Sequence, residues 1–166
     1  MQEQKTDAYS MSAEVKAEID QWLTKYPPDQ KRSAVLAALH AVQHEEGWVS
    51  VAAMDAVADY LDMPKVAVYE VSSFYSMLET KPVGRNTVAV CTNISCMLCG
   101  ADTIVDHVEK KLGIKLGEST ADGRIYLKVE EECLAACVGG PMMAVNGHYH
   151  ENLTPEKVDQ ILDGLK

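Results

Sequence analysis

Two groups of cysteines constrain this chain more than any other feature. Cys91, Cys96 and Cys99 form the first group, Cys133 and Cys137 form the second, and these five are all the cysteines in the sequence. A four-thiolate metal or cluster site needs close pairs of thiols, and folding can bring two separate loops together to supply them. The pattern therefore indicates iron–sulfur or zinc chemistry.

The composition indicates a soluble chain of the cytoplasm. Of the 166 residues, 47% are hydrophobic and 24% are charged, which is ordinary for a globular protein. The N-terminus lacks the basic and apolar segments of a signal peptide, and the longest apolar run, Ala34–Leu39, is too short to cross a membrane. We therefore expect a cytoplasmic location without membrane insertion. Thiols stay reduced there, so clustered cysteines serve as ligands or redox groups rather than as disulfides.

Charge and missing motifs exclude two classes of function. The formal net charge of -10 disfavours binding to nucleic acid, whose phosphates are also negative. The sequence contains no G-x-G-x-x-G fingerprint after a strand and no G-x-x-x-x-G-K-[ST] loop. We therefore expect a chain that carries electrons but does not itself bind a hydride donor.

Helical periodicity runs through the N-terminal half, residues 1–81. Helices are predicted from Ser12 to the Pro27-Pro28 pair, over Gln30–Glu46, after the N-cap residue Ser50, and from Pro64 to about Tyr75. Short helices with short connections predict a small helical bundle. The aromatic residues of this half, which we expect to pack in its core, are Trp22, Trp48, Phe74 and Tyr75.

The pattern changes at residues 81–86, where we place a domain boundary. The second domain, residues 82–166, reads as strand, helix, strand, hairpin and helix, which predicts a thioredoxin-like α/β layout and an α+β chain overall. Asn146-Gly147 is the hairpin signal, and Thr154-Pro155 begins the closing helix. The remaining expected elements are the strands Thr87–Val90 and Ile125–Val129, with a helix between them that ends at Gly113.

Both cysteine groups follow the carboxyl ends of strands that should be neighbours, where open α/β sheets place their sites. Several kinds of site suit them. Four thiolates can hold a 2Fe–2S cluster, and Cys96 and Cys99 with the second pair can hold structural zinc. Cys96-Met97-Leu98-Cys99 also has the spacing of a dithiol redox pair. Buried cysteines without a ligand are the fourth alternative, although that suits a single cysteine better than two groups.

The ligand set of a cluster has two alternatives. Cys91, Cys96, Cys99 and Cys133 have the spacing of plant-type ferredoxins, which leaves Cys137 unused. The other set takes two cysteines from each loop and leaves Cys99 unused. The thioredoxin-like layout favours two loops with two ligands each, because Cys99 is expected inside the following helix and turned away from the loop.

Longer motifs identify a family. They include Gly140-Pro141-Met142-Met143 after the second cysteine pair, together with three segments elsewhere, Glu45–Val49, Ser73–Ser76 and Leu153–Glu156. In these motifs, in Pro82–Arg85 and in its cysteine spacing, the chain resembles the E subunits of bacterial NADH:quinone oxidoreductase, respiratory complex I. The resemblance covers nearly the whole chain.

The resemblance implies a thioredoxin-like ferredoxin with an N-terminal helical bundle. By this resemblance, one 2Fe–2S cluster is held by Cys91, Cys96, Cys133 and Cys137, and Cys99 is not a ligand. The expected partner is the F subunit, which binds FMN and NADH and exchanges single electrons with the cluster in the peripheral arm of a membrane-bound complex. Chains of NAD-linked hydrogenases and formate dehydrogenases share the motifs, so these parent complexes stay as alternatives.

Overall fold

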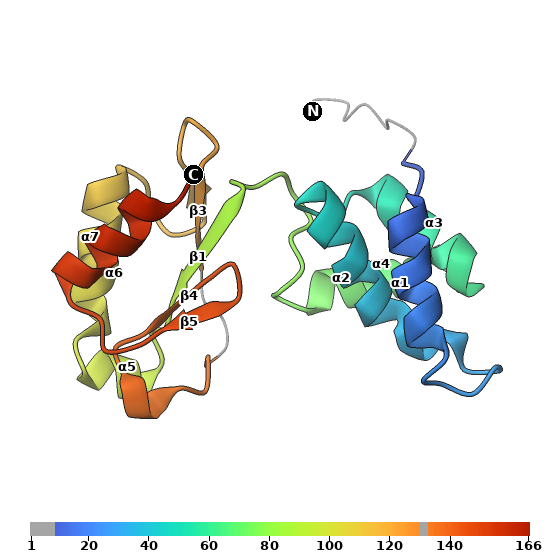
Figure 1. Ribbon diagram of the computed structural model, residues 1–166, viewed down its shortest axis with the longest axis horizontal. Helices are drawn as coiled ribbons and strands as arrows, with labels where there is room; N and C mark the ends of the chain where they lie inside the picture. Colours follow the sequence, from blue (N-terminus) through green and yellow to red (C-terminus); the bar gives the residue numbers. More distant parts are fainter. Residues whose placement is uncertain (1–8, 130–132) are drawn as a thin grey trace. The chain divides into compact units, whose positions relative to one another are not determined.

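The computed structural model describes residues 9–129 and 133–166. The chain divides into two compact units, Met1–Pro82 and Val83–Lys166, which we call the N-terminal unit and the C-terminal unit. All five cysteines belong to the C-terminal unit. Figure 1 shows both units.

Capping residues set the helix ends of the N-terminal unit. The side chains of Ser12 and Ser50 each accept a hydrogen bond of 3.1 Å from a backbone N–H in the first turn of α1 and α3. α2 ends at Gly47, whose φ of 81° is left-handed and favours glycine. The first turn of the predicted second helix is a 3₁₀ helix, η1. The bounds are α1 Ala13–Leu23, η1 Lys31–Ala34, α2 Val35–Glu46, α3 Val51–Leu61 and α4 Lys65–Phe74.

The core of this unit is formed by apolar side chains from all four α-helices, with Trp22 partly buried against it. Trp48 is half-buried. The prediction that Phe74 and Tyr75 pack in the core is wrong, because 78% of Phe74 and 36% of Tyr75 are exposed. The buried face of α4 carries Val68 and Ser72. Phe74 follows Ser72 by two positions, so the helical rotation of about 100° per residue turns it toward the opposite face.

The C-terminal unit is built on a mixed sheet of five strands in the order β2-β3-β1-β4-β5. β1 pairs in parallel with β3, with Val88 opposite Leu127, and antiparallel with β4, with Val90 opposite Met143. The parallel pair places the carboxyl ends of β1 and β3 at the same edge of the sheet (Figure 1). The strands are β1 Asn86–Val90, β2 Glu118–Ser119, β3 Ile125–Lys128, β4 Met143–Val145 and β5 His148–His150.

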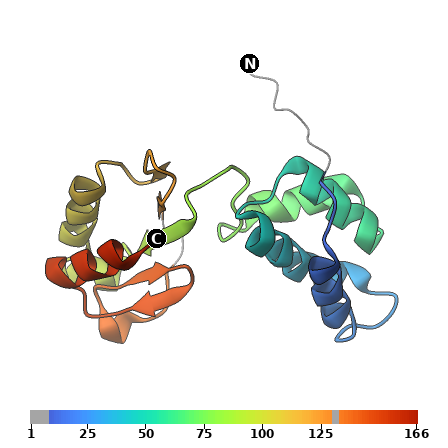
Figure 2. The same cartoon turned by 45° about the horizontal axis from the view of Figure 1, so that its top comes forward.

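Two helices, α6 (Ala101–Leu112) and α7 (Pro155–Gly164), lie side by side and cover one face of this sheet (Figures 1 and 2). Alternate residues of the strands, among them Val88 and Leu127, point into the core under the helices. The ring of His107 on α6 forms a hydrogen bond of 2.8 Å with the carboxylate of Asp159 on α7. The hydrogen bond from His107 holds the pKa of the Asp159 carboxyl below its ordinary value.

The predicted α+β class and the thioredoxin-like layout of the C-terminal half are confirmed by this fold. The hairpin turns at Asn146 and Gly147, whose φ angles of 50° and 80° are both left-handed, and α7 begins at Pro155 after its N-cap Thr154. Three short elements among the described residues were not predicted: β2, the helix α5 (Ile94–Leu98) and the 3₁₀ helix η2 (Cys137–Gly139). All three are too short to show a periodic pattern in the sequence.

Over residues 9–129 and 133–166, no helix combines the length and the apolar character needed to cross a membrane.

Candidate metal centre

Strand β1 delivers the first cysteine. Cys91 follows the last residue of the strand, and its backbone N–H donates to the carbonyl oxygen of Met142 at 3.0 Å, which continues the pairing of β1 with β4. The side chain is 2% exposed and packs with Cys96, Ala101 and Met142 in a small buried cluster. Backbone pairing therefore fixes where this thiol lies.

The helix α5 carries the other two cysteines of the first group. Cys96 lies within α5 and is 1% exposed, whereas Cys99 lies at the C-terminal end of that helix and is exposed. The prediction that Cys99 lies inside the helix after the loop is wrong, because α6 begins only at Ala101. A short helix that the sequence pattern does not show thus lies between Cys91 and α6 and carries Cys96.

The second loop runs from Cys133 to Pro141, beyond the end of β3. Ala135 adopts a left-handed φ of 57°, which is costly for a residue other than glycine, and its N–H donates to the Cys133 sulfur at 3.4 Å. The 3₁₀ helix η2, Cys137–Gly139, follows. The backbone thus turns sharply between Cys133 and Cys137, so that one short loop presents both thiols.

The first cysteine loop, residues 91–99, is in contact with the second loop. Leu134 and Ala136 of the second loop pack against the buried cluster that contains Cys91 and Cys96. At the end of the loop, a Cβ atom placed on Gly140 would lie 3.4 Å from the Cys96 sulfur and 3.5 Å from the Cys99 sulfur. Folding therefore brings together the two cysteine groups, as their positions after neighbouring strands predict, and the sulfur of Cys99 also faces the second loop.

The thiol of Cys133 interacts with Cys137 and Cys91. The hydrogen bond from the Ala135 N–H lowers the pKa of the Cys133 thiol. Loss of hydration, the hydrogen bond with Cys137 and the charges of Cys137 and Cys91 raise it, and the pKa lies above its ordinary value as a result. Thiolates so close together repel one another, and a positively charged iron or zinc centre relieves that repulsion.

The donor set fits an iron–sulfur cluster. Thiols are soft ligands, and a 2Fe–2S cluster takes two of them on each of its irons. Among the described residues, no group of three or more histidine, cysteine, aspartate or glutamate side chains is placed to hold a metal ion. Cys91, Cys96, Cys133 and Cys137 come from two loops that touch, which matches the demand for two pairs of thiols.

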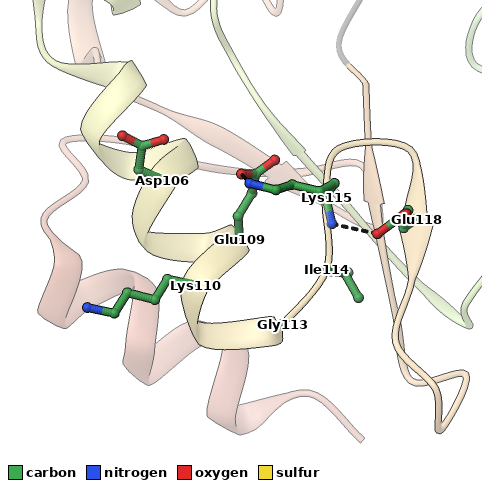
Figure 3. A pocket seen from close by; sticks show the side chains of 7 residues that line it. All are labelled: Asp106, Glu109, Lys110, Gly113, Ile114, Lys115 and Glu118. Carbon is green, nitrogen blue, oxygen red and sulfur yellow. Dashed lines mark hydrogen bonds and ion pairs between the residues drawn. The ribbon is translucent and has the colours of Figure 1, made fainter.

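A hollow in the C-terminal unit, away from the cysteines, lies between the end of α6 and β2, with a volume of about 460 Å³ (Figure 3). Three of its charged side chains, Glu109, Lys115 and Glu118, pair with one another or with the backbone around them. Lys115 forms an ion pair of 2.6 Å with Glu109, and the Lys115 N–H donates to Glu118 at 2.8 Å. Glu109 also accepts from the Leu116 N–H. We assign no chemistry to this hollow, because these carboxylates are committed to holding the loop after α6.

Fold and site together define a class of protein. Residues 19–166 match the family described as thioredoxin-like [2Fe-2S] ferredoxin, and the chain belongs to this family. Among its relatives is the E subunit of the NADH-quinone oxidoreductase of Rickettsia bellii (strain RML369-C), 46% identical over 145 residues, which are 87% of this chain and 86% of the relative. The resemblance inferred from the sequence motifs is thereby confirmed.

Two further comparisons extend this result. The NADH dehydrogenase [ubiquinone] flavoprotein 2, mitochondrial, of Dictyostelium discoideum is 38% identical over 159 residues, which cover 95% of this chain and 64% of that protein. Among solved structures, the NAD+-reducing [NiFe]-hydrogenase in the air-oxidized state aligns with a TM-score of 0.68 and 21% identity, covering 78% of this chain and 22% of that chain. At that identity the similarity is one of fold.

Proposed function

We propose that this chain holds one 2Fe–2S cluster on Cys91, Cys96, Cys133 and Cys137 and carries single electrons as the E subunit of an NADH:quinone oxidoreductase. The observation that supports the ligand set most directly is the contact between the two cysteine loops. The family, together with the relatives that are E subunits of NADH-quinone oxidoreductases, supports the electron-transfer function.

The chain's own residues would tune such a cluster. The cluster supplies one-electron chemistry, and its potential depends on hydrogen bonds to sulfur and on exposure to water. The Ala135 N–H points at the Cys133 sulfur and stabilises negative charge there. Cys91 and Cys96 are buried, whereas Cys133 and Cys137 are exposed. One side of the site is therefore shielded from water, and the other is open to an electron donor or acceptor.

The proposed partner is the F subunit, which would bind FMN and NADH and exchange electrons with the cluster. Large apolar side chains stand exposed beside the cysteines, with 71% of Ile94, 78% of Leu98 and 97% of Val138 accessible. Apolar groups gathered on a surface mark sites of protein contact.

We place the assembled complex in the cytoplasm, as part of the peripheral arm of a membrane-bound enzyme. The same role in an NAD-linked hydrogenase or formate dehydrogenase is the alternative, which purification of the native complex distinguishes.

Anaerobic purification tests the cluster. We expect a red-brown protein with two irons and two sulfides per chain, which gives the EPR signal of one unpaired electron after reduction. A colourless protein with one zinc per chain would contradict the proposal. Reduction of insulin disulfides by the metal-free protein would instead support the dithiol alternative.

The isolated chain should not oxidise NADH. A hydride carries two electrons, and a flavin is needed to divide them between one-electron carriers. With NADH and ferricyanide we expect only background turnover from the chain alone, and activity after the FMN-containing partner is added. Rapid NADH oxidation by the flavin-free chain would contradict the proposal that the partner subunit, and not this chain, oxidises NADH.

A further inference from the structure

We propose that Cys99 is a reserve ligand, able to hold the iron that Cys96 binds when the Cys96 thiol is absent. The inference rests on the proposed function, because it requires a cluster on the two loops. It concerns the one cysteine that the proposed ligand set leaves unused.

The geometry that carries the inference is the shared orientation of two sulfurs. The Cys96 and Cys99 sulfurs both lie close to Gly140 of the second loop, at 3.4 and 3.5 Å from the position that a Cβ atom would take there. Both thiols therefore face the loop that carries Cys133 and Cys137. Cys99 does not point into solvent on the far side of α5.

The backbone of α5 explains this alignment. The Cys99 N–H donates to the carbonyl oxygens of Cys96 at 3.0 Å and of Ser95 at 3.2 Å, so the helix tightens toward a 3₁₀ turn at its end. In a 3₁₀ turn the side chains at positions i and i+3 eclipse one another. Cys96 and Cys99 thus lie one above the other on the same side of the chain.

The thiols of Cys96 and Cys99 differ in burial, and this difference assigns them different roles. Cys96 is 1% exposed, whereas Cys99 is exposed and lies where α5 gives way to Gly100, whose φ of 92° is left-handed. A thiol at the end of a five-residue helix can approach the loop by a small backbone shift. A buried thiol within the helix is already placed, so Cys96 is the ligand of the native protein and Cys99 the substitute.

Replacement of the Cys96 ligand by Cys99 requires no oxidant or reductant. The Cys99 thiol releases its proton to water and the resulting thiolate forms a bond to iron, which takes the place of the bond that the Cys96 thiolate forms in the native protein. No electron is transferred, and the charge of the cluster with its four thiolates is unchanged.

Cluster reconstitution in full-length variants tests the inference. Wild type, Cys96→Ala, Cys99→Ala, the double variant and Cys133→Ala are each reconstituted anaerobically with ferrous iron and sulfide. Iron, sulfide, visible absorption and the EPR spectrum of the reduced protein are then measured. We expect wild type and Cys99→Ala to give the same spectrum. Cys96→Ala should retain most of the iron and sulfide with a shifted EPR signal, and the double variant should lose the cluster.

Cys133→Ala is the matched control. Its sulfur interacts with Cys137 and Cys91, and its substitution should lose the cluster because Cys99 faces a different part of the second loop. Because Cys96 is buried, Cys96→Ser is prepared as well, with circular dichroism to check its fold. If Cys96→Ala holds no more cluster than the double variant and Cys96→Ser no more than Cys96→Ser combined with Cys99→Ala, or if Cys133→Ala or the double variant keeps its cluster, the inference is overturned. A wild type without a cluster would instead refute the proposed function.

Discussion

At the scale of single residues, the site depends on which sulfur each backbone position directs toward the loops. β1 and α5 bury two thiols, and the second loop presents two more at the surface. Cys99 is exposed, as Cys133 and Cys137 are, but it lies at the end of α5, and its sulfur faces the second loop from there. The ligands and the spare cysteine are therefore distinguished by position in the backbone, since their side-chain chemistry is identical.

Substitution of single cysteines should separate the two candidate ligand sets. We expect Cys99→Ser to keep the wild-type cluster spectrum, and Cys137→Ser to lose the cluster or shift its spectrum strongly, because a hydroxyl is a harder and poorer ligand for iron than a thiolate. Visible absorption and EPR after anaerobic reconstitution measure both. The reverse pattern would favour the plant-type set of Cys91, Cys96, Cys99 and Cys133.

Gly84 should tolerate no side chain. A Cβ atom there would lie 2.5 Å from the carbonyl carbon of Ile125 in β3, which is backbone and cannot move alone. We expect Gly84→Ala to reduce the free energy of unfolding by about 1–3 kcal/mol, as other overpacked sites do. The loss of the cluster's visible absorption in urea reports this for the C-terminal unit. Gly164→Ala is the control, since nothing lies within 4 Å of its Cβ position and alanine suits a helix, and an equal loss in both variants would refute the steric explanation.

At the scale of elements, the helix ends of the N-terminal unit depend on side-chain caps. Ser50 accepts the Ala53 N–H at the start of α3, whose residues Val57 and Leu61 are buried in the core. The cap thus fixes where a helix with a buried face begins. Ser73, in contrast, is exposed near the end of α4 and bonds back to the carbonyl oxygen of Tyr69 within the same helix.

Ser50→Ala should therefore destabilise the N-terminal unit by about 1 kcal/mol, the usual effect of losing a serine N-cap. Both tryptophans lie in this unit, so tryptophan fluorescence during urea unfolding reports its stability selectively. Ser73→Ala is the matched control and should change stability by no more than about 0.5 kcal/mol, as is typical of exposed positions. Equal effects of the two substitutions would show that the cap does not contribute.

At the scale of the whole molecule, the two units differ in the residues that they contain. The C-terminal unit contains every cysteine, and the N-terminal unit contains none. The N-terminal unit nevertheless exposes large apolar side chains along α4, with 63% of Val66, 54% of Tyr69 and 78% of Phe74 accessible. Such surfaces suit contact with another protein, and we propose that residues 1–81 form a docking domain.

Deletion of residues 1–81 should leave a coloured protein that assembles poorly. Residues 82–166 contain all proposed ligands, so we expect the truncated chain to take up a cluster with the wild-type absorption spectrum. Its recovery with a tagged flavoprotein partner should fall well below that of the full chain. Co-purification at full occupancy would contradict the docking role, and a colourless truncated chain would show that the cluster domain depends on the N-terminal unit.

Much of this architecture is determined by the sequence itself. Ser12, Ser50 and Thr154 mark helix starts because their side chains satisfy local N–H groups. Asn146-Gly147 marks a hairpin because its turn requires left-handed residues. These signals are local, as is the cysteine spacing that identifies the family, so they can be read without knowledge of the packing.

Tertiary structure decided the features that depend on distant parts of the chain. Phe74 has the apolar character of a core residue, but only the packing of α4 shows that its face is exposed. The helix α5 is too short to leave a periodic pattern, and it changes where Cys99 lies. Whether the Cys99 sulfur faces the second loop depends on Gly140, which is brought beside it by the pairing of β1 with its neighbours. Residue spacing along the chain does not encode such a contact, because it is created only when the sheet assembles.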